Sequence, residues 1–181
     1  YMAEGMPYAS GQRLPIVMMN ANRSIATPWN IDGDHMDSMF LLNSGWIQFY
    51  VEDAQEALDM TIQAYRLAED KDVMTPVMIN LDGFILTHTY AMVKIPDQKL
   101  VDEFLPPISR QGNSMSLENP MSLCISAGKE INMEFNMKQH MDMIASEEYI
   151  EKIDAEYGDK FGRYYNGVIE SINMEDADVV L

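Results

Sequence analysis

Residues 13–37 read RLPIVMMNANRSIATPWNIDGDHMD, an apolar run that passes into a polar loop. The run from Leu14 to Met19 has no polar side chain, which is typical of a strand buried on both faces of a parallel sheet. Asn20, Asn22 and Arg23 follow at its carboxyl end, where open α/β sheets bind their ligands. The stretch therefore predicts a strand whose end contributes to a binding site.

A second apolar run with a polar end follows at residues 76–83, PVMINLDG, where Asn80 and Asp82 take the corresponding places. Between the two runs, Gly45–Val51 is predicted to be a third strand and Glu52–Glu69 a helix. A strand, a helix and a strand in that order form a right-handed crossover between parallel strands. We therefore expect an α/β fold in which the polar strand ends share one edge of a parallel sheet.

The predicted helix at 52–69 has one apolar face and an acidic first turn. Glu52 and Asp53 stand where the helix dipole favours negative charge. The apolar face follows spacings of three and four residues, which predicts packing on a sheet. Its members are Ala54, Ala57, Leu58, Thr61, Ile62, Tyr65 and Ala68.

Short motifs occur along most of the chain in the order and spacing of one known family. They are Asn22-Arg23-Ser24, Gly33-Asp34-His35 with Asp37, Ser44-Gly45-Trp46-Ile47-Gln48, Ala54-Gln55-Glu56-Ala57, Asp82-Gly83-Phe84 with His88, Ile95-Pro96-Asp97-Gln98, Phe104-Leu105-Pro106-Pro107, Glu118-Asn119-Pro120 and Phe161-Gly162-Arg163. Together they resemble the α subunit of pyruvate:ferredoxin oxidoreductases and related 2-oxoacid:ferredoxin oxidoreductases. The resemblance implies the domain that binds the pyrimidine half of thiamine diphosphate.

The implied reaction is a thiamine diphosphate-dependent oxidative decarboxylation. Coenzyme A takes the acyl group, and electrons pass through iron–sulfur clusters to ferredoxin. The motifs at 95–98 and 104–107 look most like pyruvate enzymes, so pyruvate is the expected substrate, and branched-chain 2-oxoacids and 2-oxoglutarate are alternatives. A non-catalytic assembly module remains a second hypothesis. Transketolase-like and acetolactate-synthase-like enzymes share the domain but do not explain the motifs around residues 22 and 33.

The resemblance also implies roles for individual residues. Arg23 matches the family's arginine for the substrate carboxylate, which suits a guanidinium because it can form two parallel bonds; the alternative is an exposed arginine paired with Asp34 or Asp37. Asn22 is predicted to bind substrate beside it. A supporting layer, or a lining of the cofactor cleft, is expected from Asp34, His35, Asp37, Asp82 and His88.

No metal site is expected at Asp34, His35 and Asp37, because ligands this close in a loop need a further group to complete a coordination sphere. In the family, Mg²⁺ accompanies the diphosphate on a different subunit. The single cysteine, Cys124, cannot ligate an iron–sulfur cluster alone. Mg²⁺ and [4Fe-4S] clusters are therefore expected on partner subunits or domains.

The expected organisation has three parts. Residues 1–107 form the later part of the pyrimidine-binding domain, 108–175 a linker or arm with a helix over Glu134–Ile153, and 176–181 the first strand of a following domain. The family's catalytic glutamate lies upstream of the segment that Tyr1 begins. We therefore expect a fragment truncated at both ends, without a catalytic residue of its own and inactive alone.

Composition narrows the class of partner. The net charge of −17, with only 12 Lys and Arg among 181 residues, argues against nucleic-acid binding. No apolar run approaches membrane-spanning length and no signal-peptide pattern is present, so a cytoplasmic protein without membrane contact is expected. The 17 methionines are expected to fill gaps in the core and in subunit interfaces.

Overall fold

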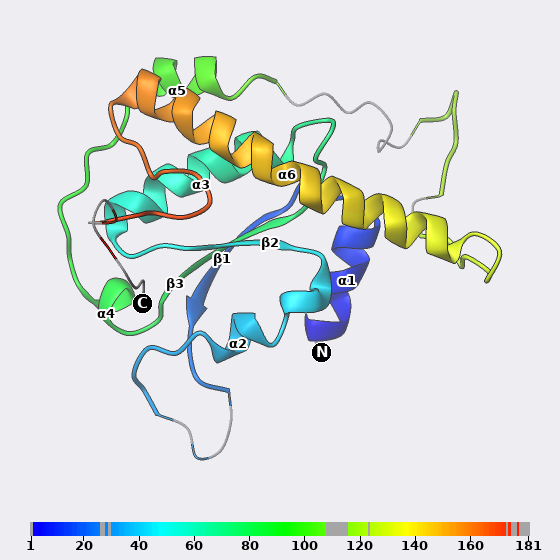
Figure 1. The fold of residues 1–181 in the computed structure, drawn as a ribbon, viewed down its shortest axis with the longest axis horizontal. Coiled ribbons are helices and arrows are strands. Elements are labelled where there is room, and N and C mark those ends of the chain that lie inside the picture. The colour runs from blue at the N-terminus through cyan, green and yellow to red at the C-terminus, as the bar shows by residue number, and fades with distance from the viewer. Residues whose placement is uncertain are drawn as a thin grey trace.

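Three parallel strands form the sheet at the centre of the computed structural model, which describes residues 2–25, 28, 30–107, 116–122, 124–172, 174 and 177 (Figure 1). The strands are β1 (Val17–Asn22), β2 (Ile47–Tyr50) and β3 (Val77–Asp82), in the order β1-β3-β2. Both pairings are parallel. The predicted α/β fold with a parallel sheet is confirmed.

Helices lie on both faces of the sheet (Figure 1). They are α1 (Met2–Gly11), α2 (Met36–Met39), the 3-10 helix η1 (Leu42–Ser44), α3 (Ala54–Ala68), α4 (Ile85–His88), α5 (Gln98–Phe104) and α6 (Asn132–Phe161). α3 crosses from β2 to the adjacent β3, as the crossover prediction requires. Asp53 begins α3 as its N-cap, accepting a 2.8 Å hydrogen bond from the Glu56 backbone N–H.

Alternate residues of β3 point into two cores. Val77 and Ile79 belong to the larger core with α3 and the later part of α6, and Met78 belongs to a smaller core with Met6 and Trp46. β3 is the central strand and its first four residues are buried, which explains why its sequence is a continuous apolar run.

β1 differs from its prediction. The strand begins at Val17 rather than Leu14 and continues through Asn22, and it is only partly buried, with Met19 55% exposed. In the described part of the chain β1 pairs with β3 alone, so it lies at the edge of the sheet. An apolar sequence sets the chemical character of a strand but not how many neighbours it has.

The predicted apolar face of α3 is also incomplete. Tyr65, assigned to that face, is 42% exposed, whereas Asp59 and Gln63 are 0% and 3% exposed. The reason is that α3 is covered twice, by the sheet on one side and by α6 on the other (Figure 1). A helix between two layers buries a second face, and polar residues can occupy it when they are hydrogen-bonded.

The helix predicted at 134–153 is present but longer, 30 residues from Asn132 to Phe161. Of the linker expected after Pro107, residues 108–115 lie outside the described residues, and so do residue 176 and residues 178–181 of the expected final strand. The division of the chain into three parts therefore stays a prediction. In the described residues, no helix combines the length and apolar character that crossing a bilayer requires.

Candidate functional site

The register of β1 and β3 brings the polar strand ends together. Asn20 lies opposite Asn80, and Asn22 lies opposite Asp82. The Asn80 side-chain oxygen accepts hydrogen bonds from the side-chain amides of Asn20 (3.2 Å) and Asn22 (3.3 Å). The prediction that these side chains share one edge of the sheet is confirmed, although they lie within the strands rather than after them.

Asn22 is fully buried, with 0% of the residue exposed. Its side-chain amide donates to the Asp37 carboxylate (2.7 Å) and to the Ser38 hydroxyl (2.9 Å), in addition to Asn80. The side chain thus ties the end of β1 to α2 and does not reach the surface, where a ligand would contact it.

Asp37 receives hydrogen bonds on both carboxylate oxygens. Oδ1 accepts from the Asn22 side chain and from the Ser38 backbone N–H, each at 2.7 Å. Oδ2 accepts from the Arg23 backbone N–H at 3.1 Å and, at the longer distance of 3.4 Å, from the Asn20 side chain. Asp37 therefore joins the last residues of β1, the start of the following loop and the first turn of α2.

The guanidinium of Arg23 lies on the surface side of this network. It donates to the Ile31 carbonyl at 3.1 Å, and its central carbon lies 5.9 Å from the centroid of the Phe84 ring. In the described part of the chain it forms no ion pair with Asp34 or Asp37, so the alternative of an arginine paired with one of these carboxylates is not observed. The cation is held in place but not neutralised by a described carboxylate.

Gly83 permits the close approach of β3 to this loop. Its backbone N–H donates to the Asn22 carbonyl at 3.0 Å. A Cβ at this position would lie 2.1 Å from the same carbonyl oxygen and 2.9 Å from Arg23 Nε. The glycine of the Asp82-Gly83-Phe84 motif is therefore required by packing against Asn22 and Arg23.

Asp82 caps the short helix α4. Its Oδ2 accepts from the backbone N–H groups of Phe84 (3.2 Å), Ile85 and Leu86 (3.1 Å). His88 lies at the other end of α4, where its Nδ1 is 2.9 Å from the Phe84 carbonyl and its ring centroid 5.7 Å from that of Phe84. Both residues shape the segment that presents Phe84 to Arg23.

Asp34 and His35 lie farther from the guanidinium. Asp34 accepts a 2.7 Å hydrogen bond from the Met36 backbone N–H and so shapes the entry to α2. The His35 ring packs edge-to-face on Tyr50, at the carboxyl end of β2, with centroids 5.0 Å apart. Of the predicted supporting residues, Asp37 thus contacts Arg23 directly. Asp82 and His88 order the segment that carries Phe84, and Asp34 and His35 contact neighbouring segments.

The carboxylates at this edge are occupied by N–H donors. Asp37 uses both oxygens, and three backbone amides converge on one oxygen of Asp82. Among the described residues, no cluster of three or more His, Cys, Asp or Glu has the arrangement of a metal site. The bonding makes these carboxylates supports of the loop and poor candidates for metal ligands.

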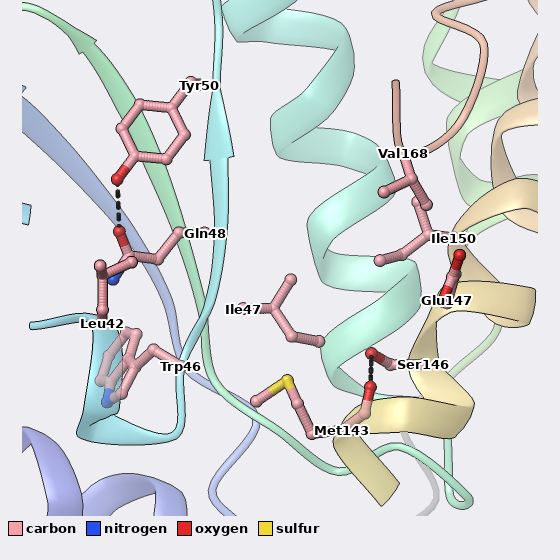
Figure 2. Close-up of a pocket in the computed structure, with 10 residues that line it drawn as sticks. All are labelled: Leu42, Trp46, Ile47, Gln48, Tyr50, Met143, Ser146, Glu147, Ile150 and Val168. Atoms are coloured by element: carbon pink, nitrogen blue, oxygen red, sulfur yellow. Dashed lines mark hydrogen bonds between the residues drawn. The ribbon is translucent and has the colours of Figure 1, made fainter. Parts of the chain in front are cut away.

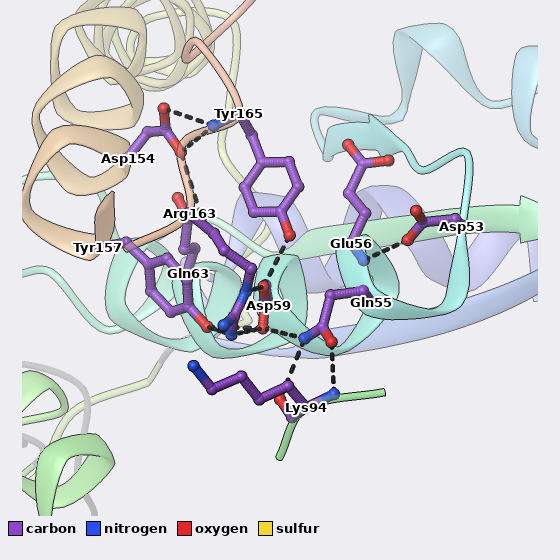
Figure 3. Close-up of polar contacts among 10 residues, drawn as sticks. All are labelled: Asp53, Gln55, Glu56, Asp59, Gln63, Lys94, Asp154, Tyr157, Arg163 and Tyr165. Atoms are coloured by element: carbon purple, nitrogen blue, oxygen red, sulfur yellow. Dashed lines mark hydrogen bonds and ion pairs between the residues drawn. The ribbon is translucent and has the colours of Figure 1, made fainter. Parts of the chain in front are cut away.

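A buried polar cluster around Asp59 was not predicted from the sequence (Figure 3). The Asp59 carboxylate, fully buried, pairs with Arg163 and accepts hydrogen bonds from the hydroxyls of Tyr157 and Tyr165, each at 2.7 Å. Gln55 donates to it at 3.0 Å. Two features of the sequence could have pointed to this cluster. One is the acid Asp59 within the predicted helix at 52–69, and the other is the basic residue of the Phe161-Gly162-Arg163 motif.

Ionisation in the cluster follows from these contacts. Burial raises the pKa of Asp59, but the hydrogen bonds from Arg163, Tyr165, Tyr157 and Gln55 outweigh it, so the pKa lies below its usual value. The pKa values of Tyr157 and Tyr165 are both raised. The larger cause is burial, and the second is the hydrogen bond that each hydroxyl donates to Asp59. Asp59 is therefore a structural anion whose tyrosine partners stay protonated.

A groove beside β2 was also not predicted (Figure 2). Its cavity volume is about 390 Å³, and it lies between β2 with the preceding turn and α6. Its lining is mostly apolar: Leu42, Trp46, Ile47, Gln48, Tyr50, Met143, Ser146, Glu147, Ile150 and Val168. The Tyr50 hydroxyl donates to Gln48 Oε1 at 2.7 Å and lies 3.1 Å from the Ser38 hydroxyl, so the groove borders the network behind Asp37.

By its fold, the molecule is an α/β protein in which polar residues lie at the carboxyl ends of parallel strands. In open α/β sheets this edge is where ligands are bound. A family model described as "Pyruvate flavodoxin/ferredoxin oxidoreductase, thiamine diP-bdg" matches residues 1–155. The chain therefore belongs to this family of thiamine diphosphate-binding domains, and the family resemblance seen in the sequence motifs is confirmed.

Individual relatives agree with the family. The chain is 44% identical to pyruvate synthase subunit PorA of Methanocaldococcus jannaschii, over 99% of this chain and 46% of that protein. It is 44% identical to the subunit of the same name in Methanothermobacter thermautotrophicus, over 96% and 45%. Ketoisovalerate oxidoreductase subunit VorA of Pyrococcus horikoshii is 40% identical over 99% of this chain and 45% of that protein. The chain thus spans less than half the length of these relatives.

Proposed function

We propose that the chain is part of the α subunit of a pyruvate:ferredoxin oxidoreductase. The reaction would be the thiamine diphosphate-dependent oxidative decarboxylation of pyruvate to acetyl-CoA and CO₂, with electrons passed to ferredoxin in the cytoplasm. Family membership supports the class of enzyme. The single observation that carries the role of this chain is the Arg23 guanidinium, held at the strand-end edge beside Phe84 without a carboxylate partner among the described residues.

The residues at this edge fit the ring half of thiamine diphosphate better than its diphosphate half. Phe84 is 36% and Ile85 66% exposed next to Arg23, which provides apolar surface beside one cation. The carboxylates of Asp37 and Asp82 already accept N–H groups, so they are poorly placed to ligate Mg²⁺. Mg²⁺, the diphosphate site and the [4Fe-4S] clusters are accordingly assigned to partner subunits or domains. When bound, thiamine diphosphate supplies the carbanion chemistry of decarboxylation.

The role proposed for Arg23 is to hold the carboxylate of the 2-oxoacid. A guanidinium stays charged at any working pH and can make two parallel hydrogen bonds to a carboxylate, so it fixes both charge and orientation. Phe84 supports the cation from one side, and the Ile31 carbonyl accepts a hydrogen bond from Nη1. Among the described residues the guanidinium has no second hydrogen-bond acceptor, so its other terminal N–H groups can bind a ligand.

Arg23→Ala in the complete enzyme complex tests this role. Loss of a charged contact should raise the KM for the 2-oxoacid by about 30-fold or more, while the KM for thiamine diphosphate changes little. Arg66→Ala is the matched control, because Arg66 lies on α3 and pairs with Glu156 at 3.8 Å, away from the strand ends. An unchanged KM for the 2-oxoacid in Arg23→Ala would remove Arg23 from the substrate site.

The choice of 2-oxoacid rests on sequence resemblance, and relatives of both kinds are similar to this chain. Pyruvate synthase subunits and ketoisovalerate oxidoreductase subunits are matched at 44% and 40% identity. The second candidate is therefore a branched-chain 2-oxoacid oxidoreductase. Comparing kcat/KM for pyruvate and ketoisovalerate in one enzyme preparation decides between them: a preference for pyruvate supports the proposal, and a preference for ketoisovalerate replaces it.

A further inference from the structure

Resting on the proposed function, we infer that Asp37 is the positioning residue that sets the place of Arg23 in the substrate site. Arg23 opens a loop that leaves the sheet at the end of β1 and returns to it at α2. The Asp37 carboxylate stands where the two ends of this loop meet. It accepts a 3.1 Å hydrogen bond from the backbone N–H of Arg23, which follows β1. It also accepts a 2.7 Å hydrogen bond from the backbone N–H of Ser38 in α2.

The contacts of Asp37 are directed at the backbone of Arg23 and not at its side chain. A guanidinium paired with Asp37 would be neutralised, whereas a backbone bond leaves its charge free for a substrate carboxylate. Asn22, the residue before Arg23, is fixed to the same carboxylate at 2.7 Å and is fully buried. Two successive residues are thus fastened to one anion, and the side chain of the second one projects from a rigid base.

The chemistry of the site requires a carboxylate at position 37. Donors face both oxygens: Asn22 and the Ser38 N–H face Oδ1, and the Arg23 N–H and Asn20 face Oδ2. A carboxylate can only accept hydrogen bonds, so all of these donors are satisfied. An amide in either orientation would direct its own N–H groups at other N–H donors. Asp37→Asn therefore keeps the shape of the side chain and breaks the hold on the loop.

Asp32 provides a matched control. It stands five residues earlier in the same loop, it is exposed, and its backbone N–H donates to the Asn30 side-chain oxygen at 3.0 Å. That bond uses the backbone of Asp32, so an asparagine at this position keeps it. Asp32→Asn therefore removes the same charge from the same loop and leaves the bonds of Arg23 and Asn22 to Asp37 intact.

The test is a double-mutant cycle in the complete, anaerobically purified complex. Asp37→Asn should raise the KM for the 2-oxoacid about tenfold, with the KM for thiamine diphosphate within about twofold of the wild type, and Asp32→Asn should change neither. In an Arg23→Ala background, Asp37→Asn should add less than about twofold, because its effect acts through Arg23. A tenfold effect that persists in that background would overturn the inference. If Asp37→Asn does not assemble, Asp37→Glu, which keeps the charge and displaces the carboxylate by one methylene, takes its place in the cycle.

Hydrogen–deuterium exchange of the same variants gives a readout independent of turnover. The backbone amides of Arg23 and Ser38 should exchange faster in Asp37→Asn than in the wild type or in Asp32→Asn, because these two N–H groups lose their acceptor. Unchanged exchange would overturn the positioning role whatever the kinetics. If Arg23→Ala alone leaves the oxoacid KM unchanged, the proposed function of Arg23 fails, and the exchange data still decide whether Asp37 holds the loop.

Discussion

The carboxylate of Asp59 joins three separate segments of the chain through its own hydrogen bonds. Arg163 and Tyr165 come from the segment after α6, Tyr157 from α6 itself, and Gln55 from the first turn of α3. Gln55 extends the connection to Lys94, accepting from its backbone N–H at 2.6 Å and donating to its carbonyl at 3.2 Å. Each of these segments depends on the same buried anion for its position (Figure 3).

Asp59→Asn is therefore expected to destabilise the protein by about 2 kcal/mol, because it removes the buried anion that binds the partly exposed Arg163 and two tyrosine hydroxyls. Thermal or urea unfolding of the subunit measures the loss. Asp102→Asn is the control, since Asp102 is exposed and accepts one hydrogen bond from Gln98 at 2.8 Å. Equal stability of the Asp59→Asn variant and the wild type would show that the cluster contributes nothing net.

The contribution of Asp59 to the free energy of unfolding should depend on pH. Because the hydrogen bonds outweigh burial and lower the pKa of Asp59 in the folded state, its contribution is fully present above the pKa of the unfolded chain. That contribution is lost as the pH falls through the lower, folded-state pKa. The difference in unfolding free energy between wild type and Asp59→Asn should be constant from pH 7 to about pH 4 and shrink below it. A difference that grows on acidification would contradict the assignment.

At the scale of elements, the contact of β3 with β1 at Gly83 fixes where the polar edge lies. Gly83→Ala would place a methyl group 2.1 Å from the Asn22 carbonyl oxygen, which belongs to the backbone and cannot turn aside. We expect a loss of stability of about 1–3 kcal/mol, as for other overpacked sites, and a raised oxoacid KM because Arg23 Nε is displaced as well.

Gly5→Ala is the matched control for this prediction. Gly5 lies within α1, and a Cβ there meets nothing within 4 Å, so alanine should leave stability unchanged or raise it by up to about 1 kcal/mol. Comparing the unfolding midpoints of the two variants separates the close approach at Gly83 from a general effect of replacing glycine. Equal midpoints would contradict the close packing described for the β3–loop junction.

The two ends of α6 behave differently. Its later part contributes Ile153 and Tyr157 to the larger core, whereas Met133, Met137, Met141 and Ile144 on its earlier part are 49–74% exposed. The Arg13–Asp142 ion pair at 2.8 Å holds the middle of the helix to the segment before β1. The periodicity of the sequence predicts one apolar face along α6, and the described residues cover only its later half.

At the scale of the whole molecule, the sequence was sufficient for the fold class and for the meeting of the two strand ends. The apolar runs near residues 14 and 76, each closed by polar residues, and the intervening helix 52–69 lead directly to a parallel sheet with a shared edge. The strand order could not be predicted, because the sequence of a strand does not show which other strands pair with it. The exposure of β1 depends on strand order, and the burial of Asp59 depends on the packing of α6 and the segment after it over α3.

For the candidate site, the sequence identified the residues but not their contacts. Arg23, Asp37 and Asp82 could be picked out because the family motifs contain them, but the partner of each carboxylate could not. Sequence reasoning allowed Asp37 to pair with the Arg23 side chain, and the structure shows a bond to the Arg23 backbone instead. Partners of this kind are set by the path of a loop, to which local sequence contributes little.

The methionines were expected to fill gaps in the core and in interfaces. Met6, Met60 and Met78 are buried, as the first part of that expectation requires. Many others in the described residues are exposed, including Met92 at 98% and Met133 at 74%. Their contribution to subunit interfaces stays a prediction, in a chain that spans less than half the length of its relatives.

The most direct test of the central claim is an omission assay on the native complex that contains this chain. After anaerobic purification, reduction of ferredoxin or a viologen dye is followed with 2-oxoacid, coenzyme A and thiamine diphosphate, and with each left out in turn. We predict rapid reduction that requires the 2-oxoacid, is strongest with pyruvate, and falls to background without thiamine diphosphate or coenzyme A. A complex that retains thiamine diphosphate and its iron–sulfur clusters but reduces no acceptor with any 2-oxoacid would contradict the account and favour an assembly role.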